Sequence, residues 1–154
     1  MAKVTTQHIG AAGELLVQYQ LLKFGIDSAR LTTDSGVDLV MHLPSQGGEA
    51  IAATVQVKTK LKPVPAGGKG KPTLGFPVPT KERAQWLACA DVSRDAVWLF
   101  RIGEAFMYAK QIPPLLYWYI DDAPVGALRE SDLVEYRLET VVEKLLGAAG
   151  IEIV

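Results

Sequence analysis

Two apolar segments joined by a short loop constrain the fold of this chain more than any other feature. Val37–Leu43 and Ala50–Lys60 both alternate apolar and polar residues, the pattern of half-buried β-strands. Pro44–Gly48, which lies between them, combines proline, serine and glycine and is typical of a loop. The sequence therefore predicts a β-hairpin whose strands carry polar residues that a plain core strand does not need.

These polar residues are expected to share one surface of the hairpin, because side chains alternate across a strand. Asp38 lies on one face of the first strand, and Gln56 and Lys58 lie on one face of the second. Pairing of the two strands would bring a carboxylate, an amide oxygen and an ammonium group together. Two simpler interpretations stay open: Asp38 as a strand-edge or turn residue, and Gln56 with Lys58 as a solvated strand face.

The N-terminal region predicts a helix from about Gln7 to Phe24, capped by Thr5 or Thr6 and ended by a glycine in a left-handed conformation. Its first half contains the small residues of Gly10–Gly13, which permit another element to pack very close. Glu14 follows them directly and can approach the hairpin as a further carboxylate. Exposure to solvent is the alternative for a glutamate in the middle of a helix.

The order of the remaining elements predicts an α/β or α+β fold with a mixed sheet, and 154 residues suit one domain, 1–154. Thr33–Gly36 is expected to form a turn, with Asp34 as a turn residue. The apolar and aromatic Leu115–Ile120 fits either core or a homodimer surface. The other expected elements are a short strand near Ser28–Leu31, a strand at Thr73–Val78 that rejoins the sheet, a helix from Pro79 to Ala90, strands at Ala96–Ile102 and Ala105–Ala109, and a closing helix from Glu130 to Leu146.

Charge is distributed unevenly along the chain, although the formal net charge is only −1. One segment carries seven basic residues against Glu82 alone: Lys58, Lys60, Lys62, Lys69, Lys71, Lys81 and Arg83. The rest of the chain carries nine basic and sixteen acidic residues. The basic segment indicates a surface that faces phosphates, and a mobile, solvated lysine-rich loop is the alternative.

The sequence favours a cytoplasmic protein that does not enter a membrane. Its apolar stretches are shorter than a bilayer-spanning helix, and the N-terminus lacks the pattern of a secretory signal. Cys89, the only cysteine, cannot form an internal disulfide, which fits a reducing compartment. We expect Cys89 to be a small buried residue in a helix rather than a nucleophile.

A helix-borne Glu14, then SGVDLV (Ser35–Val40), then VQVKTK (Val55–Lys60) together resemble the PD-(D/E)XK nuclease superfamily. The pattern is similar to the variant with Gln56 at the second acidic position, as in Mrr-type restriction endonucleases. The helix glutamate resembles that of archaeal Holliday-junction resolvases. The resemblance covers roughly Thr6–Arg101 and implies a restriction-endonuclease-like αβββαβ core, with residues 102–154 as an extension.

The resemblance implies a Mg²⁺-dependent or Mn²⁺-dependent cut in the phosphodiester backbone of DNA. Asp38, Gln56 and the backbone carbonyl of Val57 would bind the ion, with Glu14 as a further ligand, because hard cations prefer oxygen. Lys58 would assist hydrolysis. The lysines expected to follow the DNA backbone are Lys60, Lys62, Lys69 and Lys71. A catalytically weak or inactive nuclease fold that serves as a DNA-binding or protein-interaction subunit is the alternative.

Overall fold

The first helix forms within two residues of the bounds that the sequence predicts. The structure is a computed structural model that describes residues 2–33, 35–81 and 83–151. In it, α1 (Thr6–Leu22) is capped by Thr5, whose hydroxyl accepts a hydrogen bond from the His8 N–H at 3.2 Å. The Thr5 N–H donates in return to His8 Nδ1 at 3.0 Å. Gly25 follows the helix with a φ of +76°, the left-handed conformation expected there.

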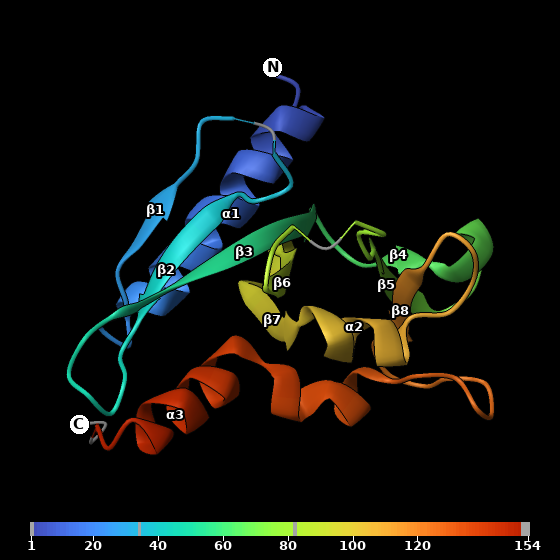
Figure 1. Ribbon diagram of the computed structural model, residues 1–154. Helices are drawn as coiled ribbons and strands as arrows, with labels where there is room; N and C mark the ends of the chain where they lie inside the picture. Colours follow the sequence, from blue (N-terminus) through green and yellow to red (C-terminus); the bar gives the residue numbers. More distant parts are fainter. Residues whose placement is uncertain (1, 34, 82, 152–154) are drawn as a thin grey trace.

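A five-stranded mixed sheet forms the centre of the fold, in the order β1-β2-β3-β6-β7 (Figure 1). Its strands are β1 (Ser28–Arg30), β2 (Leu39–Leu43), β3 (Ile51–Lys60), β6 (Trp86–Asp91) and β7 (Ala96–Arg101). The predicted hairpin is confirmed, since β2 and β3 pair antiparallel with Met41 opposite Ala53. β3 and β6 pair parallel, and the other neighbours pair antiparallel.

A second, three-stranded sheet lies beside the first and is made of β4 (Val64–Pro65), β5 (Pro72–Pro77) and β8 (Leu115–Tyr119). The expected strand at Thr73–Val78 exists, but it pairs with β8 and does not rejoin the main sheet. β8 alternates strictly: Leu116 and Trp118 are fully buried, and their neighbours are half-buried. This part of the Leu115–Ile120 segment is therefore core.

The helix expected from Pro79 to Ala90 is wrong: residues 79–81 and 83–85 form no helix, and residues 86–90 belong to β6. Glu82 lies outside the described residues. β6 is buried on both faces between β3 and β7, so it lacks the apolar–polar alternation that identifies a strand. Cys89 is buried, as expected, but in this strand and not in a helix. Burial raises the pKa of its thiol well above the usual range, which leaves it unreactive.

The strand expected at Ala105–Ala109 is also wrong, because α2 (Ile102–Tyr108) occupies these residues. The Glu104 carboxylate accepts a hydrogen bond from the Arg101 N–H at 2.9 Å and closes the first turn of α2.

The closing helix is divided at Arg137 into a 3₁₀ segment, η3 (Glu130–Tyr136), and α3 (Leu138–Ala148). The described residues also form two short 3₁₀ turns, η1 (Ala66–Gly68) and η2 (Val92–Arg94).

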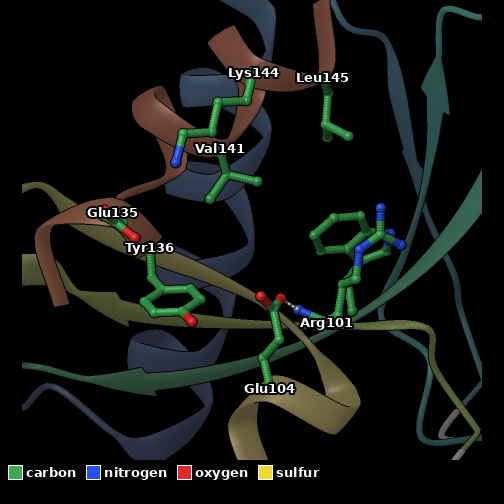
Figure 2. A pocket seen from close by; sticks show the side chains of 8 residues that line it. Arg101, Glu104, Glu135, Tyr136, Val141, Lys144 and Leu145 are labelled. Carbon is green, nitrogen blue, oxygen red and sulfur yellow. Dashed lines mark hydrogen bonds between the residues drawn. The ribbon is translucent and has the colours of Figure 1, made fainter. Parts of the chain in front are cut away.

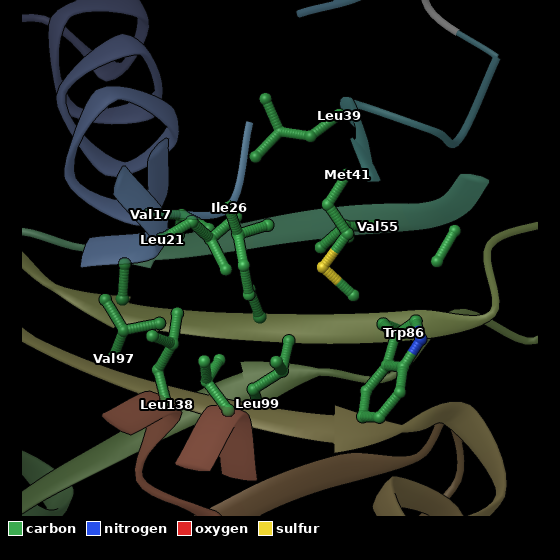
Figure 3. Packing of buried hydrophobic residues seen from close by; sticks show 14 of the residues in the cluster. Val17, Leu21, Ile26, Leu39, Met41, Val55, Trp86, Val97, Leu99 and Leu138 are labelled. Carbon is green, nitrogen blue, oxygen red and sulfur yellow. The ribbon is translucent and has the colours of Figure 1, made fainter. Parts of the chain in front are cut away.

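α1 and α3 cover one face of the main sheet, and the small sheet covers the other together with α2. Figure 3 shows Val17 and Leu21 of α1 packed with Val55 of β3, and Leu138 of α3 beside Leu99. On the opposite face, a second cluster joins the main sheet to the small sheet and contains Leu87, Cys89, Trp98 and Phe100 with Leu74, Phe76, Leu116 and Trp118. The expected fold class is confirmed: an α+β fold with a mixed sheet flanked by helices.

The connection from β3 to the parallel β6 explains the departure from the expected element order. Parallel neighbours need a crossover, which is commonly a helix. Here the segment between them contributes β4, η1 and β5, so strands of the small sheet replace the expected crossover helix. Among the described helices, none is long and apolar enough to cross a lipid bilayer.

Candidate active site

α1 packs against β3 at a position that only glycine fits. A Cβ atom built at Gly13 would lie 2.7 Å from Thr59 Cβ, whereas one built at Gly10 would meet nothing within 4 Å. The small residues expected to permit a close approach therefore do so at Gly13. Glu14 is the next residue, and this contact brings its backbone close to the sheet.

Asp38 lies just before β2 and interrupts the pairing with β3. Its N–H donates to the Val55 carbonyl at 2.9 Å, while Leu39 is the register partner of the same Val55. Two consecutive residues of one strand thus lie opposite one residue of the other, which is the arrangement of a β-bulge. Asp38 Oδ2 accepts a hydrogen bond of 2.7 Å from the Val57 N–H, which fixes the carboxylate at the point where β2 and β3 separate.

The backbone of Val57 faces the same edge of β3 as the Asp38 carboxylate. In an extended strand, the N–H and C=O of one residue point toward the same neighbouring strand. Since the Val57 N–H donates to Asp38, its carbonyl projects to that side as well. The carbonyl predicted as a metal ligand and the predicted carboxylate therefore lie at the same edge of β3, the edge that faces β2.

Glu14 reaches this edge from α1. Its side chain is 20% exposed, and Oε2 lies 3.7 Å from Nη2 of Arg30, at the end of β1. Burial raises the pKa of the Glu14 carboxyl above its ordinary value, the negative charge of Asp38 raises it further, and Arg30 opposes both. The two carboxylates therefore repel each other, and a cation bound between them would relieve that repulsion.

Gln56 and Lys58 lie on the face of β3 opposite α1. Their register partners in β6 are Leu87 and Cys89, which belong to the cluster under the small sheet. The ammonium group of Lys58 is close enough to Cys89 to lower its pKa, against the larger effect of burial. Both polar side chains are half-buried, so they are not a fully solvated strand face.

The predicted residues thus approach one strand edge from two sides. Glu14 comes from the α1 side, and Gln56 and Lys58 come from the other. The bulge places Asp38 at the edge between them, so simple alternation along the strand does not describe its position. That Asp38, Glu14, Gln56 and the Val57 carbonyl bind one ion, with Lys58 beside it, stays a prediction.

A hollow of about 410 Å³ opens beside Gln56 and is lined by two cationic side chains that are not part of the motif. We call it the basic hollow; it is lined by Ser35, Gly36, Gln56, Pro79, Thr80, Lys81 and Arg83. Arg83 Nη1 donates to the Ser35 carbonyl at 3.3 Å, which connects this loop to the turn before Asp38. Lys81 and Arg83 appeared in the sequence only as charges in the basic segment. A site was not expected there, because the segment was interpreted as a helix.

The lysines expected to follow DNA occupy two places. Lys60 ends β3 and is exposed, and Lys62 follows it in the exposed connection to β4. Lys69 and Lys71 lie in the turn between β4 and β5. The Lys71 ammonium lies 3.5 Å from Asp122 in an exposed ion pair, so part of its charge is compensated. Their contact with DNA stays a prediction.

Another hollow, between β7, α2 and α3, contains none of the predicted site residues (Figure 2). Its lining residues are Trp86, Arg101, Glu104, Glu135, Tyr136, Val141, Lys144 and Leu145. The Arg101 guanidinium lies 4.5 Å from the centre of the Trp86 ring, a cation–π contact. Two acidic and two basic side chains line this hollow, whereas the charged residues described in the lining of the basic hollow are both cationic.

The donor set at the strand edge fits a hard divalent cation. The described residues contain no group of three or more His, Cys, Asp or Glu side chains arranged for a metal ion. The ligands available here are two carboxylates, from Glu14 and Asp38, with oxygens of an amide and a backbone carbonyl. All of these are oxygen ligands, which suit Mg²⁺ and Mn²⁺.

Comparison with solved structures relates the fold to nucleases. The chain is similar to a structure described as a bacterial homing endonuclease, I-Ssp6803I, with a TM-score of 0.61. The match covers 94% of this chain and 96% of that chain at 15% sequence identity. No protein-family model and no curated protein matches the sequence. At this identity the likeness establishes a shared fold, and the activity must be argued from the site.

Proposed function

We propose that this protein is a Mg²⁺-dependent nuclease of the PD-(D/E)XK type that hydrolyses phosphodiester bonds in DNA, with Gln56 at the second acidic position. Mn²⁺ would support the same reaction when it is bound in place of Mg²⁺. One observation carries the proposal: the Asp38 carboxylate is fixed by the Val57 N–H at a strand edge that Glu14 also approaches. The likeness of the fold to a homing endonuclease supports it.

Asp38 and Glu14 would hold the ion through their carboxylates. Gln56 and the Val57 carbonyl would complete the protein ligands with neutral oxygens, and water molecules would occupy the remaining positions. When bound, the divalent ion polarises a phosphoryl oxygen and lowers the pKa of bound water. The Val57 N–H orients the Asp38 carboxylate, as outer hydrogen bonds commonly do for metal ligands.

Lys58 would act next to the scissile phosphate. The residue is half-buried, so its interaction with negative charge is screened less than that of a surface lysine. It would either orient the attacking water or stabilise the charge that develops on the phosphorane-like transition state. Both roles require that the ammonium group remain charged.

We also propose that residues 1–154 form one domain of a cytoplasmic DNA-binding enzyme. Leu138 and Val142 of the C-terminal segment belong to the same core cluster as Val17 of α1, so the extension beyond Arg101 packs on the nuclease-like core. A homodimer on the outer side of β8 is a further proposal, for which Tyr117 and Tyr119 would supply half-buried aromatic surface.

Nicking of supercoiled plasmid DNA tests the function. Asp38→Ala and Lys58→Ala should each lower Mg²⁺-dependent nicking about 1,000-fold, because charge stabilisation of this kind contributes several kcal/mol. Lys144→Ala, which removes a cation from the other hollow, is the matched control and should cut normally. Circular dichroism confirms that the variants are folded. Normal cutting by both site variants would remove the proposal.

A specific observation keeps the alternative of an inactive DNA-binding subunit in view. Gln56 is a neutral and weaker ligand than the carboxylate it replaces, which reduces the affinity of the site for a cation. Calorimetric titration with Mg²⁺ and Mn²⁺ separates the two functions. An active nuclease shows heat that disappears in Asp38→Ala, and a degenerate site shows no heat that depends on Asp38.

A further inference from the structure

We infer that the basic hollow is a phosphate subsite that holds a backbone phosphate of the DNA strand next to the scissile one. The inference rests on the proposed function for its substrate, and it assigns a role to Lys81 and Arg83 that the motif does not. Three observations carry it: the charge and donors of the lining, the anchored position of Arg83, and the contact of the hollow with Gln56.

The described lining of the hollow offers hydrogen-bond donors and positive charge. Lys81 and Arg83 contribute ammonium and guanidinium groups, and Ser35 and Thr80 contribute hydroxyls. Asp34 and Glu82, their neighbours in the chain, lie outside the described residues. A guanidinium next to an ammonium group is a pattern that recognises phosphate, since the guanidinium matches two phosphate oxygens at once.

The position of Arg83 is fixed by the turn across from it. One of its N–H groups donates to the Ser35 carbonyl at 3.3 Å, and a Cβ built at Gly36 would lie 3.3 Å from Arg83 Cδ. A guanidinium has five N–H donors, so one bond to a carbonyl orients it and leaves capacity for a ligand. The chain at Gly36 has a φ of +83°, which favours glycine and permits this close contact.

The hollow borders the proposed metal site through one residue. Gln56 lines the hollow and lies one residue from Val57, whose N–H binds the Asp38 carboxylate. A DNA strand with its scissile phosphate at Asp38 would therefore extend over Gln56 into the hollow with its neighbouring phosphate. Since this subsite binds charge and not base edges, it would add affinity without sequence specificity.

The test uses metal-free protein in EDTA, so that binding is measured without cleavage. Three probes are titrated and followed by the backbone amide signals of Ser35, Gly36 and Gln56: inorganic phosphate, a short oligothymidylate, and its uncharged methylphosphonate analogue. We expect the charged oligonucleotide to shift these signals and to bind at least about tenfold more tightly than either other probe. The methylphosphonate lacks the charged oxygens that form the strongest hydrogen bonds, and inorganic phosphate lacks the contacts of the neighbouring phosphates.

Variants of the hollow sharpen the test. Lys81→Ala should weaken oligothymidylate binding about tenfold and lower the salt dependence of log K by about one. Arg83→Lys retains the charge but loses the bidentate hydrogen-bond donor, so it should weaken oligothymidylate binding by a smaller factor than Lys81→Ala. Lys144→Ala is the matched control and should bind normally. Dispersed amide spectra confirm that each variant is folded.

Several results would overturn the inference. They are shifts that fall elsewhere on the protein, equal binding of the uncharged analogue, equal binding of inorganic phosphate, or normal binding by Lys81→Ala. The outcome is separate from that of the proposed function. Asp38→Ala should retain oligothymidylate binding in EDTA while losing nicking, so a failure of catalysis and a failure of the subsite have different signatures.

Discussion

The two faces of β3 differ in what surrounds them. On one face, Val55 is fully buried and Thr59 contacts Gly13 of α1 so closely that no larger residue fits. On the other face, Gln56 and Lys58 are half-buried, and Gln56 lines the basic hollow. The two faces therefore have different roles. The packed face fixes the position of the strand, and the polar face carries the side chains that we propose as functional groups.

Substitution of one residue on each face tests whether the two faces have these different roles. Lys58→Met keeps the side-chain length but removes the charge, and it should lower Mg²⁺-dependent nicking about 1,000-fold. Its free energy of unfolding should stay within about 0.5 kcal/mol of wild type, because no core contact is removed. Plasmid nicking and urea unfolding of the same preparation measure both quantities.

Val55→Ala is the complementary substitution on the packed face. It should lower the free energy of unfolding by about 2 kcal/mol through the cavity it leaves, while folded protein continues to nick DNA. If Lys58→Met unfolded the protein, or Val55→Ala abolished cutting without destabilisation, the division between the faces would be incorrect.

A substitution at the contact between α1 and β3 should lower the stability somewhat more than Val55→Ala. Gly13→Ala should lower the free energy of unfolding by about 3 kcal/mol, because the new methyl group would overlap the Thr59 side chain. Gly10→Ala is the matched control on the same helix and should raise stability by up to about 1 kcal/mol, since nothing lies within 4 Å. Equal effects of the two substitutions in urea unfolding would show that α1 does not approach β3 at Gly13.

The raised pKa of Glu14 predicts a smaller, pH-dependent effect. Folding favours the protonated carboxyl, so the contribution of Glu14 to stability is fully present below the ordinary pKa of 4.5 and is lost as pH rises through the raised folded value. Glu14→Gln cannot titrate and should gain stability relative to wild type across that interval in EDTA. Urea unfolding from acidic to neutral pH measures the difference, and a constant difference between the two proteins would contradict a raised pKa.

Single lysines of the basic segment should have the smallest effects. Lys60→Ala and Lys62→Ala should each lower the salt dependence of log K for DNA binding by about one. Lys71→Ala should lower it by less, because Asp122 lies 3.5 Å from the ammonium group. Fluorescence anisotropy at several salt concentrations makes the measurement. A slope that changes equally for Lys71 and Lys62 would show that the ion pair with Asp122 does not persist in solution.

The parts of the fold that sequence could predict are those with a local signal. The hairpin follows from alternation in its two strands, and α1 follows from its cap and helical period. β6 could not be identified in this way, because WLACAD is buried on both faces and shows no alternation. The small sheet depends on pairing between β5 and β8, which are distant in the chain and carry no local signal for each other.

The candidate site divides in the same way. Residue types and spacing identified Asp38, Gln56 and Lys58, and the glycine-rich helix identified Glu14. The bulge at Asp38 depends on the register of two strands, which spacing does not determine. Lys81 and Arg83 belong to a loop whose position depends on β6, so they could be located only after that strand was known.

We propose above all that one divalent ion is bound at the edge where β2 and β3 separate. A crystal structure of the protein grown with Mn²⁺, with an anomalous difference map, tests it most directly. The manganese peak should lie about 2.2 Å from oxygens of Asp38 and the Val57 carbonyl, with Glu14 or Gln56 as a further ligand. A map at saturating Mn²⁺ with no peak at Asp38, or with the peak on the other face of the sheet, would contradict it.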